Sequence, residues 1–170
     1  MMSDVLANQS RIQKIRDKLQ KDDLDAFFIS TPQNRRYLSG FTGTAGYLVI
    51  TASTAILATD FRYVEQATNQ APGYDVLRIA GGDWFPSLLS DLNARNVGFE
   101  SHNLTVAQYK HYTDLLKAKN HEFHTSLVAT AGIVENLRSR KDPEELSSIQ
   151  IAIDIADRAF DEVSRKLRPG

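Results

Sequence analysis

The 170-residue sequence contains no cysteine, and its 20 basic residues nearly balance its 21 acidic residues. A chain without cysteine forms neither a disulfide framework nor a thiolate metal site, which fits a reducing compartment and predicts a cytoplasmic protein. A formal net charge of -1 provides no field for nucleic acid or for an anionic membrane surface, so we exclude both classes of partner.

The chain also lacks recognisable targeting and membrane-spanning segments. Residues 1–9 do not combine a basic start with an apolar core, as secretory signal peptides do. No run approaches the roughly 18 apolar residues of a membrane span. With 42% hydrophobic and 24% charged residues, the sequence predicts a protein that buries roughly 70% of its unfolded surface around one core.

Hydrophobic periodicity indicates strands that alternate with helices. Two runs of β-forming residues, 47–51 and 54–59, are separated by Ala52 and Ser53 and predict a hairpin. Interleaved strands and helices with one such hairpin predict an α/β fold, in which a mixed β-sheet is flanked by helices. We expect strands at 25–30, 74–79, 96–100 and 121–125, helices at about 12–22, 60–70, 84–94, 105–119 and 127–138, and an extended turn at Thr31 and Pro32 that leads into a glycine-containing loop.

The last part of the chain predicts a long helix with a well-marked start. Asp142 suits the capping position, Pro143 the first helical position and Glu145 the third, where each complements unpaired amides or the helix dipole. An apolar stripe then runs to about Leu167, so this helix requires a partner to cover it. The stripe consists of Leu146, Ile149, Ile153, Ala156, Phe160 and Val163.

Gly40, Gly43 and Gly46 follow one another at short intervals and could suggest a phosphate-binding loop. Such loops connect a strand to a helix whose amino terminus faces the anion, whereas a strand follows these glycines. We therefore favour a structural interpretation, in which the glycines provide positive φ angles or allow close approach of two backbones.

Other candidate residues carry weak signals. His121 and His124 lack the helical spacing of a metal-binding pair, and residues three apart on a strand point to opposite faces, so we expect solvent-facing histidines. Asp60 is interpreted as a helix cap in preference to a catalytic acid. Trp84, the single tryptophan, is interpreted as a core residue, with a position at an interface as the alternative.

Arg62 lies in the first turn of a predicted helix, where the helix dipole favours anions over cations. Such a conflict indicates either an ion pair with Asp60 or Glu65 or a contact with a substrate. A guanidinium suits a peptide carboxylate or carbonyl because its planar fork donates two parallel hydrogen bonds. The neighbouring pair Arg35-Arg36 raises the same question, and both interpretations stay open at this point.

Two motifs on either side of the predicted hairpin carry a family resemblance. The first is Arg36-Tyr37-Leu38-Ser39-Gly40-Phe41, and the second is Asp60-Phe61-Arg62-Tyr63. In this order they resemble the amino-terminal domain of aminopeptidase P, which belongs to the prolidase and creatinase family, and the resemblance covers nearly the whole chain. It implies a creatinase-like amino-terminal domain over residues 1–138, followed at residues 139–170 by the linker and first helix of a carboxyl-terminal domain that this sequence does not contain.

The resemblance also implies a function for a longer protein. It predicts a metallopeptidase that releases the amino-terminal residue from peptides with proline in second position, using two divalent metal ions, usually manganese, that the carboxyl-terminal domain holds. The amino-terminal domain would cap the active site and mediate homo-oligomerisation, and the fragment alone would be inactive, without catalytic or metal-binding residues. The residues implied to lie near the substrate are Arg36, Tyr37, Arg62 and Tyr63.

Several alternatives share this scaffold. A prolidase, which cleaves X-Pro dipeptides, and a creatinase-type hydrolase have the same architecture, and the Asp60–Tyr63 motif favours aminopeptidase P among them. A non-catalytic module that binds peptides or proteins is a further alternative. An independent α/β domain that dimerises through its terminal helix is the last, and deletion of residues 142–170 would distinguish it.

Overall fold

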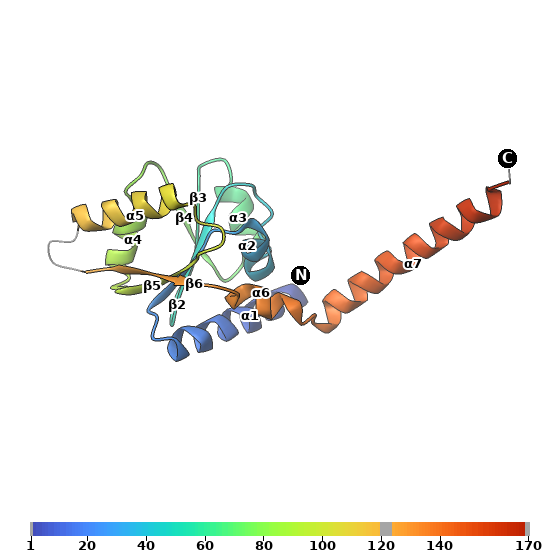
Figure 1. The fold of residues 1–170 in the computed structure, drawn as a ribbon, viewed down its shortest axis with the longest axis horizontal. Helices are drawn as coiled ribbons and strands as arrows, with labels where there is room; N and C mark the ends of the chain where they lie inside the picture. The colour runs from blue at the N-terminus through green and yellow to red at the C-terminus, as the bar shows by residue number, and fades with distance from the viewer. Residues whose placement is uncertain (1, 120–123, 169–170) are drawn as a thin grey trace. The chain divides into compact units, whose positions relative to one another are not determined.

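A computed structural model describes residues 2–119 and 124–168 of the chain, which divides into two compact units, Met1–Glu135 and Asn136–Gly170 (Figure 1). The boundary that we expect at residue 138 stays a prediction. The elements in chain order are α1 (Met2–Lys21), β1 (Ala26–Ile29), α2 (Pro32–Ser39), β2 (Tyr47–Thr51), β3 (Ala55–Thr59), α3 (Val64–Gln70), β4 (Asp75–Arg78), α4 (Trp84–Asp91), β5 (Asn96–Glu100), α5 (Val106–Lys119), β6 (Ser126–Thr130), α6 (Ile133–Ser139) and α7 (Pro143–Lys166).

The described strands of the first unit form one sheet in the order β4-β3-β2-β1-β5-β6. β2 pairs antiparallel with both β1 and β3, which confirms the predicted hairpin. The other pairs, β1 with β5, β5 with β6 and β3 with β4, are parallel. Five strands therefore run in one direction and β2 alone runs against them, so the predicted mixed α/β sheet is confirmed.

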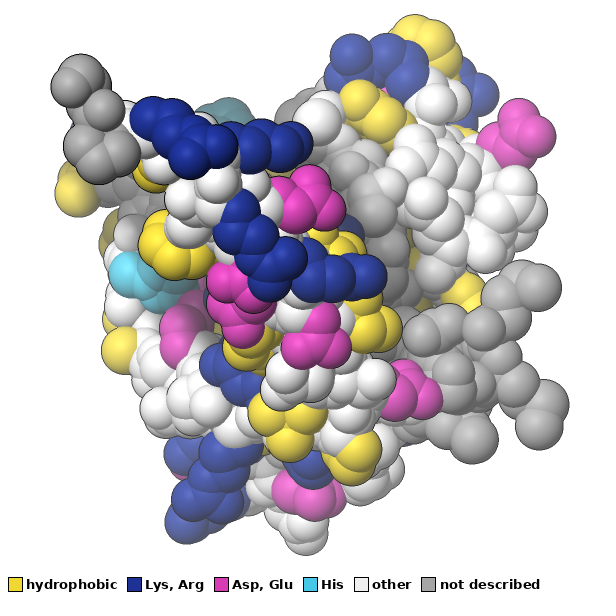
Figure 2. Space-filling model, turned by 90° about the vertical axis from the view of Figure 1, so that its right-hand side faces the viewer, with side chains coloured by type: hydrophobic (Ala, Val, Ile, Leu, Met, Phe, Trp, Pro, Cys, Tyr) yellow, Lys and Arg dark blue, Asp and Glu magenta, His cyan; other side chains and the backbone are white. Residues whose placement is uncertain are grey.

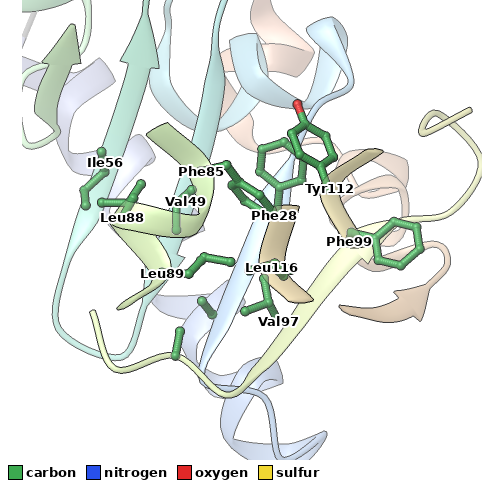
Figure 3. Packing of buried hydrophobic residues seen from close by; sticks show 12 residues of the cluster. Phe28, Val49, Ile56, Phe85, Leu88, Leu89, Val97, Phe99, Tyr112 and Leu116 are labelled. Atoms are coloured by element: carbon green, nitrogen blue, oxygen red, sulfur yellow. The ribbon is translucent and has the colours of Figure 1, made fainter. Parts of the chain in front are cut away.

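Helices cover both faces of this sheet, which explains why its central strands are apolar throughout rather than alternating. On one face, α4 and α5 pack against Phe28 of β1, whose ring centroid lies 4.5 Å from that of Phe85 and 5.7 Å from that of Tyr112 (Figure 3). On the other face, α1 buries an apolar stripe that includes Ile15 and Leu19. Figure 1 shows α1 on the opposite side of the sheet from α4 and α5.

Trp84 lies half-buried at the rim of this core. Its ring stacks on that of Tyr47 with centroids 5.4 Å apart, and it packs against the aromatic cluster around Phe28. Trp84 thus packs against the core without being fully buried, and its position at an interface stays a prediction.

The end of the first unit differs from the prediction. Residues 126–130 form strand β6 rather than the start of a helix, and the predicted strand at 121–125 falls mostly on residues outside the described ranges. β6 pairs in parallel with β5 from Asn96↔Ser126 to Glu100↔Thr130. Periodicity alone does not distinguish a strand from a helix in an apolar run this short. The pairing with β5 therefore decides that residues 126–130 form a strand.

The predicted extended turn at Thr31 and Pro32 is also wrong in part. Thr31 is extended, with φ -69° and ψ 122°, as the residue before a proline should be. Pro32 then occupies the first position of helix α2 instead of continuing a turn. Arg36 and Tyr37 consequently lie on a helix, and the loop begins only at Gly40, whose φ of 76° ends the helix.

Helix α3 begins later than predicted, because residues 60–63 form a turn before Val64. Tyr63, not Asp60, occupies the capping position, and it makes no side-chain capping bond. The interpretation of Asp60 as the cap is therefore wrong. Arg62 precedes the helix, so the predicted conflict with the helix dipole does not arise there.

Helix α7 forms as predicted, and its start is a complete capping box. The Asp142 side chain accepts a hydrogen bond from the Glu145 amide at 2.9 Å, and the Glu145 side chain accepts one from the Asp142 amide at 3.0 Å. None of its described residues is buried, and Phe160 leaves 73% of its surface exposed. No described helix has the length and apolarity needed to cross a membrane.

Candidate functional site

Polar and charged side chains that could bind a ligand gather at one edge of the sheet. Because all strands except β2 run in the same direction, their carboxyl ends meet at one edge, where β2 begins. Open α/β sheets bind ligands at this edge. Thr31 and Asp60 lie there in the segments that follow β1 and β3, and Glu100 is the last residue of β5. We call this the carboxyl edge.

One face of the molecule, shown in Figure 2, carries charged side chains of both signs. On the face shown in Figure 2, Lys and Arg side chains (dark blue) are interspersed with Asp and Glu (magenta) and with hydrophobic side chains. This distribution agrees with the near balance of 20 basic and 21 acidic residues in the sequence. Because no field of one sign marks a site on this face, we describe the candidate site by its individual contacts.

The loop between α2 and β2 is held by a buried arginine. Arg35 is only 3% exposed, and its guanidinium donates hydrogen bonds to the carbonyls of Gly43, at 2.5 Å, and Gly46. Burial lowers the pKa of this guanidinium from its usual value. The sequence drew attention to the Arg35-Arg36 pair, but the two residues differ completely, because Arg36 is exposed in the last turn of α2.

The glycines of this loop are structural. Gly40 and Gly46 have positive φ angles of 76° and 156°. A Cβ atom on Gly43 would overlap the ring of Phe41, which is completely buried. The structural interpretation is therefore confirmed, with positive φ at Gly40 and close packing at Gly43.

Tyr63 connects this loop to the turn before α3. Its hydroxyl lies 2.8 Å from that of Thr44, and its ring meets that of Phe41 edge-on, with centroids 6.1 Å apart. The Arg62 guanidinium lies 5.3 Å from the centroid of the Tyr63 ring. Two of the four residues predicted near the substrate, Arg62 and Tyr63, thus lie together at the carboxyl edge.

Arg62 also makes the ion pair that the sequence offered as the alternative. Its Nη2 lies 2.7 Å from Asp60 Oδ2, and its Nε lies 3.0 Å from Asp60 Oδ1. Hydrogen bonding from Arg62 holds the pKa of Asp60 below its usual value, and Asp60 in turn raises the pKa of Arg62. The side chain is 59% exposed, and its Nη1 has no partner among the described residues. An exposed pair of this kind contributes little to stability, so it leaves Arg62 available to a ligand.

The other two predicted residues lie elsewhere on α2. Tyr37 is half-buried beneath the guanidinium of Arg11 in α1, which lies 4.0 Å from the ring centroid. Arg11 also donates a 2.8 Å hydrogen bond to the Tyr37 carbonyl. Tyr37 thus joins α1 to α2, and Arg36 is exposed beside it.

Sequence reasoning missed a buried carboxylate. Glu100, at the end of β5, is 2% exposed. Its Oε2 accepts hydrogen bonds from the amides of Ser30, at 2.8 Å, and Thr31, at 2.6 Å, and its Oε1 accepts one from the Asn34 amide group at 2.6 Å. Glu100 therefore caps the start of α2 from a distant part of the chain. No local pattern reveals this role, because its partners lie 66 to 70 residues away.

A histidine and a second carboxylate extend this polar cluster. His102 Nε2 lies 3.4 Å from Glu135 Oε1 and 3.3 Å from Thr31 Oγ1. Asn34 donates hydrogen bonds to both Glu100 and Glu135. The sequence shows no cluster of carboxylates near His102, and the fold brings Glu135 to it from a distant part of the chain. His124 is exposed, as predicted, whereas His121 lies outside the described residues.

Comparison with known proteins identifies the family. The model of the creatinase/prolidase N-terminal domain matches residues 11–140. The chain belongs to this family. It is 32% identical, over 162 residues, to the uncharacterized peptidase YqhT of Bacillus subtilis, and the match covers 94% of the chain but 44% of that relative. The chain thus spans less than half the length of this relative.

Solved structures agree with the assignment to the creatinase/prolidase N-terminal domain. An Xaa-Pro dipeptidase from Bacillus anthracis superposes with a TM-score of 0.86 at 33% identity, over 96% of this chain and 44% of that one. The N-terminal domain of the cytoplasmic peptidase PepQ from Mycobacterium tuberculosis superposes with a TM-score of 0.68 at 37% identity, over 75% of this chain and 98% of that one.

The described residues of this creatinase/prolidase N-terminal domain do not fit a two-metal centre. They contain no group of three or more His, Asp or Glu side chains that could hold a metal ion. Glu100, the most buried carboxylate of the carboxyl edge, is committed to the amides of Ser30, Thr31 and Asn34.

Proposed function

We propose that this chain is the non-catalytic first domain of a proline-specific metallopeptidase. One observation carries the proposal: the likeness to the Bacillus anthracis Xaa-Pro dipeptidase extends over 96% of the chain but only 44% of that peptidase. More than half of such a peptidase thus has no counterpart here. We assign residues 139–170 to the linker and first helix of a carboxyl-terminal domain. That domain would hold two divalent metal ions, for which manganese is our first choice.

The role of this domain is to cap the active site and to bind the substrate from one side. Arg62 and Tyr63 are the residues that would meet the peptide, because they lie together at the carboxyl edge and Arg62 leaves its Nη1 open. A guanidinium fork matches a peptide carboxylate or carbonyl. Arg36, exposed on α2, is a more peripheral candidate, and Tyr37 would support it from its position beneath Arg11.

The substrate is a peptide with proline in second position. The length of that peptide distinguishes a dipeptidase from an aminopeptidase. The relatives include peptidases named for Xaa-Pro dipeptides and for Xaa-Pro amino-terminal cleavage. We favour the aminopeptidase, because the Asp60–Tyr63 motif resembles that branch. A cytoplasmic location, as for the cytoplasmic peptidase PepQ of Mycobacterium tuberculosis, and homo-oligomerisation complete the proposal.

The decisive experiment uses the complete gene product with manganese. It should hydrolyse Ala-Pro-Ala, lose this activity with chelator, and leave Ala-Ala-Ala intact, whereas residues 1–170 alone should be inactive. Preference for Ala-Pro over Ala-Pro-Ala would change the assignment to a prolidase. A complete gene product that binds such peptides without cleaving them would support a non-catalytic binding module and overturn the enzymatic proposal.

Arg62→Lys tests the assigned contact. Lysine keeps the charge but loses the fork, so kcat/KM for Ala-Pro-Ala should fall about ten-fold while the melting temperature stays constant. Arg78→Lys, at an exposed arginine of edge strand β4, is the matched control and should change neither quantity. A lower melting temperature with intact kinetics would show that Arg62 serves only its pair with Asp60.

A further inference from the structure

Arg35 has an unusual environment for a buried cation. At 3% exposure it has no carboxylate partner among the residues that the structure describes, and its Nε has no hydrogen-bond partner. A buried charge normally requires a paired charge or full hydrogen bonding, because leaving water is costly. Among the described residues, its guanidinium finds acceptors in the carbonyls of Gly43 and Gly46 alone, which belong to one loop.

These contacts determine which way the loop faces. The Gly43 carbonyl points inward to Arg35, and the Ala45 carbonyl accepts a 2.6 Å hydrogen bond from the Thr59 hydroxyl. The peptide bonds are trans and planar, so the N–H group of each following residue points the opposite way. The amides of Thr44 and Gly46 are thereby directed away from Arg35 and Thr59.

The outward side of the loop adjoins the proposed peptide contacts. Thr44 is exposed, and its hydroxyl lies 2.8 Å from that of Tyr63. The Tyr63 ring is in turn 5.3 Å from the Arg62 guanidinium. The Thr44 amide, the two hydroxyls and the guanidinium are all hydrogen-bond donors, which suits a carbonyl or carboxylate oxygen of a peptide.

The geometry points to Arg35 as a positioning residue: by holding the carbonyls of Gly43 and Gly46 inward, it presents Thr44 and Tyr63 to the peptide beside Arg62. This inference rests on the proposed function, because the bound group is the peptide substrate. Arg35 acts from behind the loop and does not touch the substrate, since its side chain is buried.

The test compares two arginines that both bind backbone carbonyls. In the complete gene product, Arg35→Lys keeps the charge but loses the planar fork, whose Nη1 and Nη2 donate to the two carbonyls in a fixed geometry, so KM for Ala-Pro-Ala should rise about ten-fold with kcat unchanged. Arg16→Lys is the matched control, because Arg16 donates to the Thr51 carbonyl at the other end of β2, 3.1 Å away. It should lower the melting temperature and leave KM unchanged.

A second variant keeps the inference testable if Arg35→Lys does not fold. Thr44→Val removes the hydroxyl that meets Tyr63 without touching the core, and it should also raise KM. In the double variant Arg35→Lys/Thr44→Val, KM should rise no further than in the single variants, because both act through one surface. Additive increases, or an Arg35→Lys enzyme with unchanged KM, would overturn the inference.

A separate measurement on the 170-residue chain does not depend on catalysis. Arg35→Lys should shift the NMR signals of the Thr44 amide and of the Tyr63 ring, whereas Arg16→Lys should leave them in place. Unmoved signals would refute the positioning role. If the wild-type complete protein cleaves no Xaa-Pro peptide, the proposed function fails, and moved signals would then limit the role of Arg35 to shaping the surface.

Discussion

Replacement of Glu100 by glutamine tests the capping of α2 most directly. The carboxylate is almost fully buried and receives hydrogen bonds from the Ser30 and Thr31 amides on one oxygen and from Asn34 on the other. Glutamine has nearly the same shape but only one acceptor oxygen. Whichever way its amide group turns, its NH2 group faces a donor, so at least one contact is lost.

The magnitude follows from these contacts. The less costly orientation turns the NH2 group toward Asn34, which retains its bond to Glu135. The two amide bonds then lose their charge assistance, at roughly 1 kcal/mol each, and the Asn34 bond is lost at roughly 1 kcal/mol. Because glutamine also avoids the desolvation of a buried charge, we expect a net loss of about 2 kcal/mol in the free energy of unfolding.

Urea and thermal unfolding followed by circular dichroism measure this loss, and about 2 kcal/mol corresponds to a melting temperature lower by about 7 °C for a unit of this size. Glu135→Gln is the control, because this carboxylate is 38% exposed and its variant should lose less than about 0.5 kcal/mol. Equal unfolding free energies for the two variants would refute the assignment of Glu100 as the cap of α2.

Three further predictions concern other parts of the fold. Gly40→Val and Gly43→Val should each lower stability by about 1 to 3 kcal/mol in urea unfolding, Gly40 through its positive φ and Gly43 through overlap with the Phe41 ring. Burial raises the pKa of Tyr74 and Tyr112, so the folded state retains their protons above pH 10 while the unfolded state loses them. Stability should therefore fall as the pH rises above about 10, by about 1.4 kcal/mol per pH unit for Tyr74 and by less for Tyr112, and Tyr74→Phe should make that slope shallower. Deletion of residues 142–170 should leave the melting temperature of the first unit unchanged. If the apolar stripe of α7 causes the chain to self-associate, light scattering should show that the deletion abolishes the self-association.

Local signals in the sequence predict those elements whose determinants are local. The β2–β3 hairpin follows from two β-rich runs around Ala52 and Ser53, and the start of α7 follows from Asp142 and Glu145, which cap one another within one turn. The family motifs likewise identified the domain. In each case the physical cause lies within a few residues of its effect.

Several of the failures occur where the cause is distant in the chain. The Thr31 side chain does not cap helix α2, and the amides of Ser30 and Thr31, just before the helix, donate to Glu100 on β5. Strand β6 depends on pairing with β5. Arg35 and Arg36 look equivalent in the sequence, and only the closing of the loop onto Gly43 and Gly46 separates a buried cation from an exposed one.

Arg35 and Arg62 illustrate how one edge of the sheet combines rigidity with access. Arg35 is buried and bonded to the loop carbonyls of Gly43 and Gly46, so its cost of desolvation is compensated only while that loop keeps its shape. Arg62 is exposed and pairs with Asp60 through Nε and Nη2. Breaking this exposed ion pair costs little free energy, so Arg62 can turn to a ligand.

The exposed apolar stripe of helix α7 supports the proposal that the chain acts together with further structure. Isolated helices are marginal in water, and in proteins an amphipathic helix is stabilised mainly by packing its apolar face. The 24 residues of α7 bury none of their side chains, although Ile149, Ile153 and Phe160 lie on one stripe. A second copy of the chain or a following domain could cover this stripe. The likeness to the Bacillus anthracis dipeptidase extends over 96% of the chain but 44% of that peptidase, so we favour the following domain in our proposal.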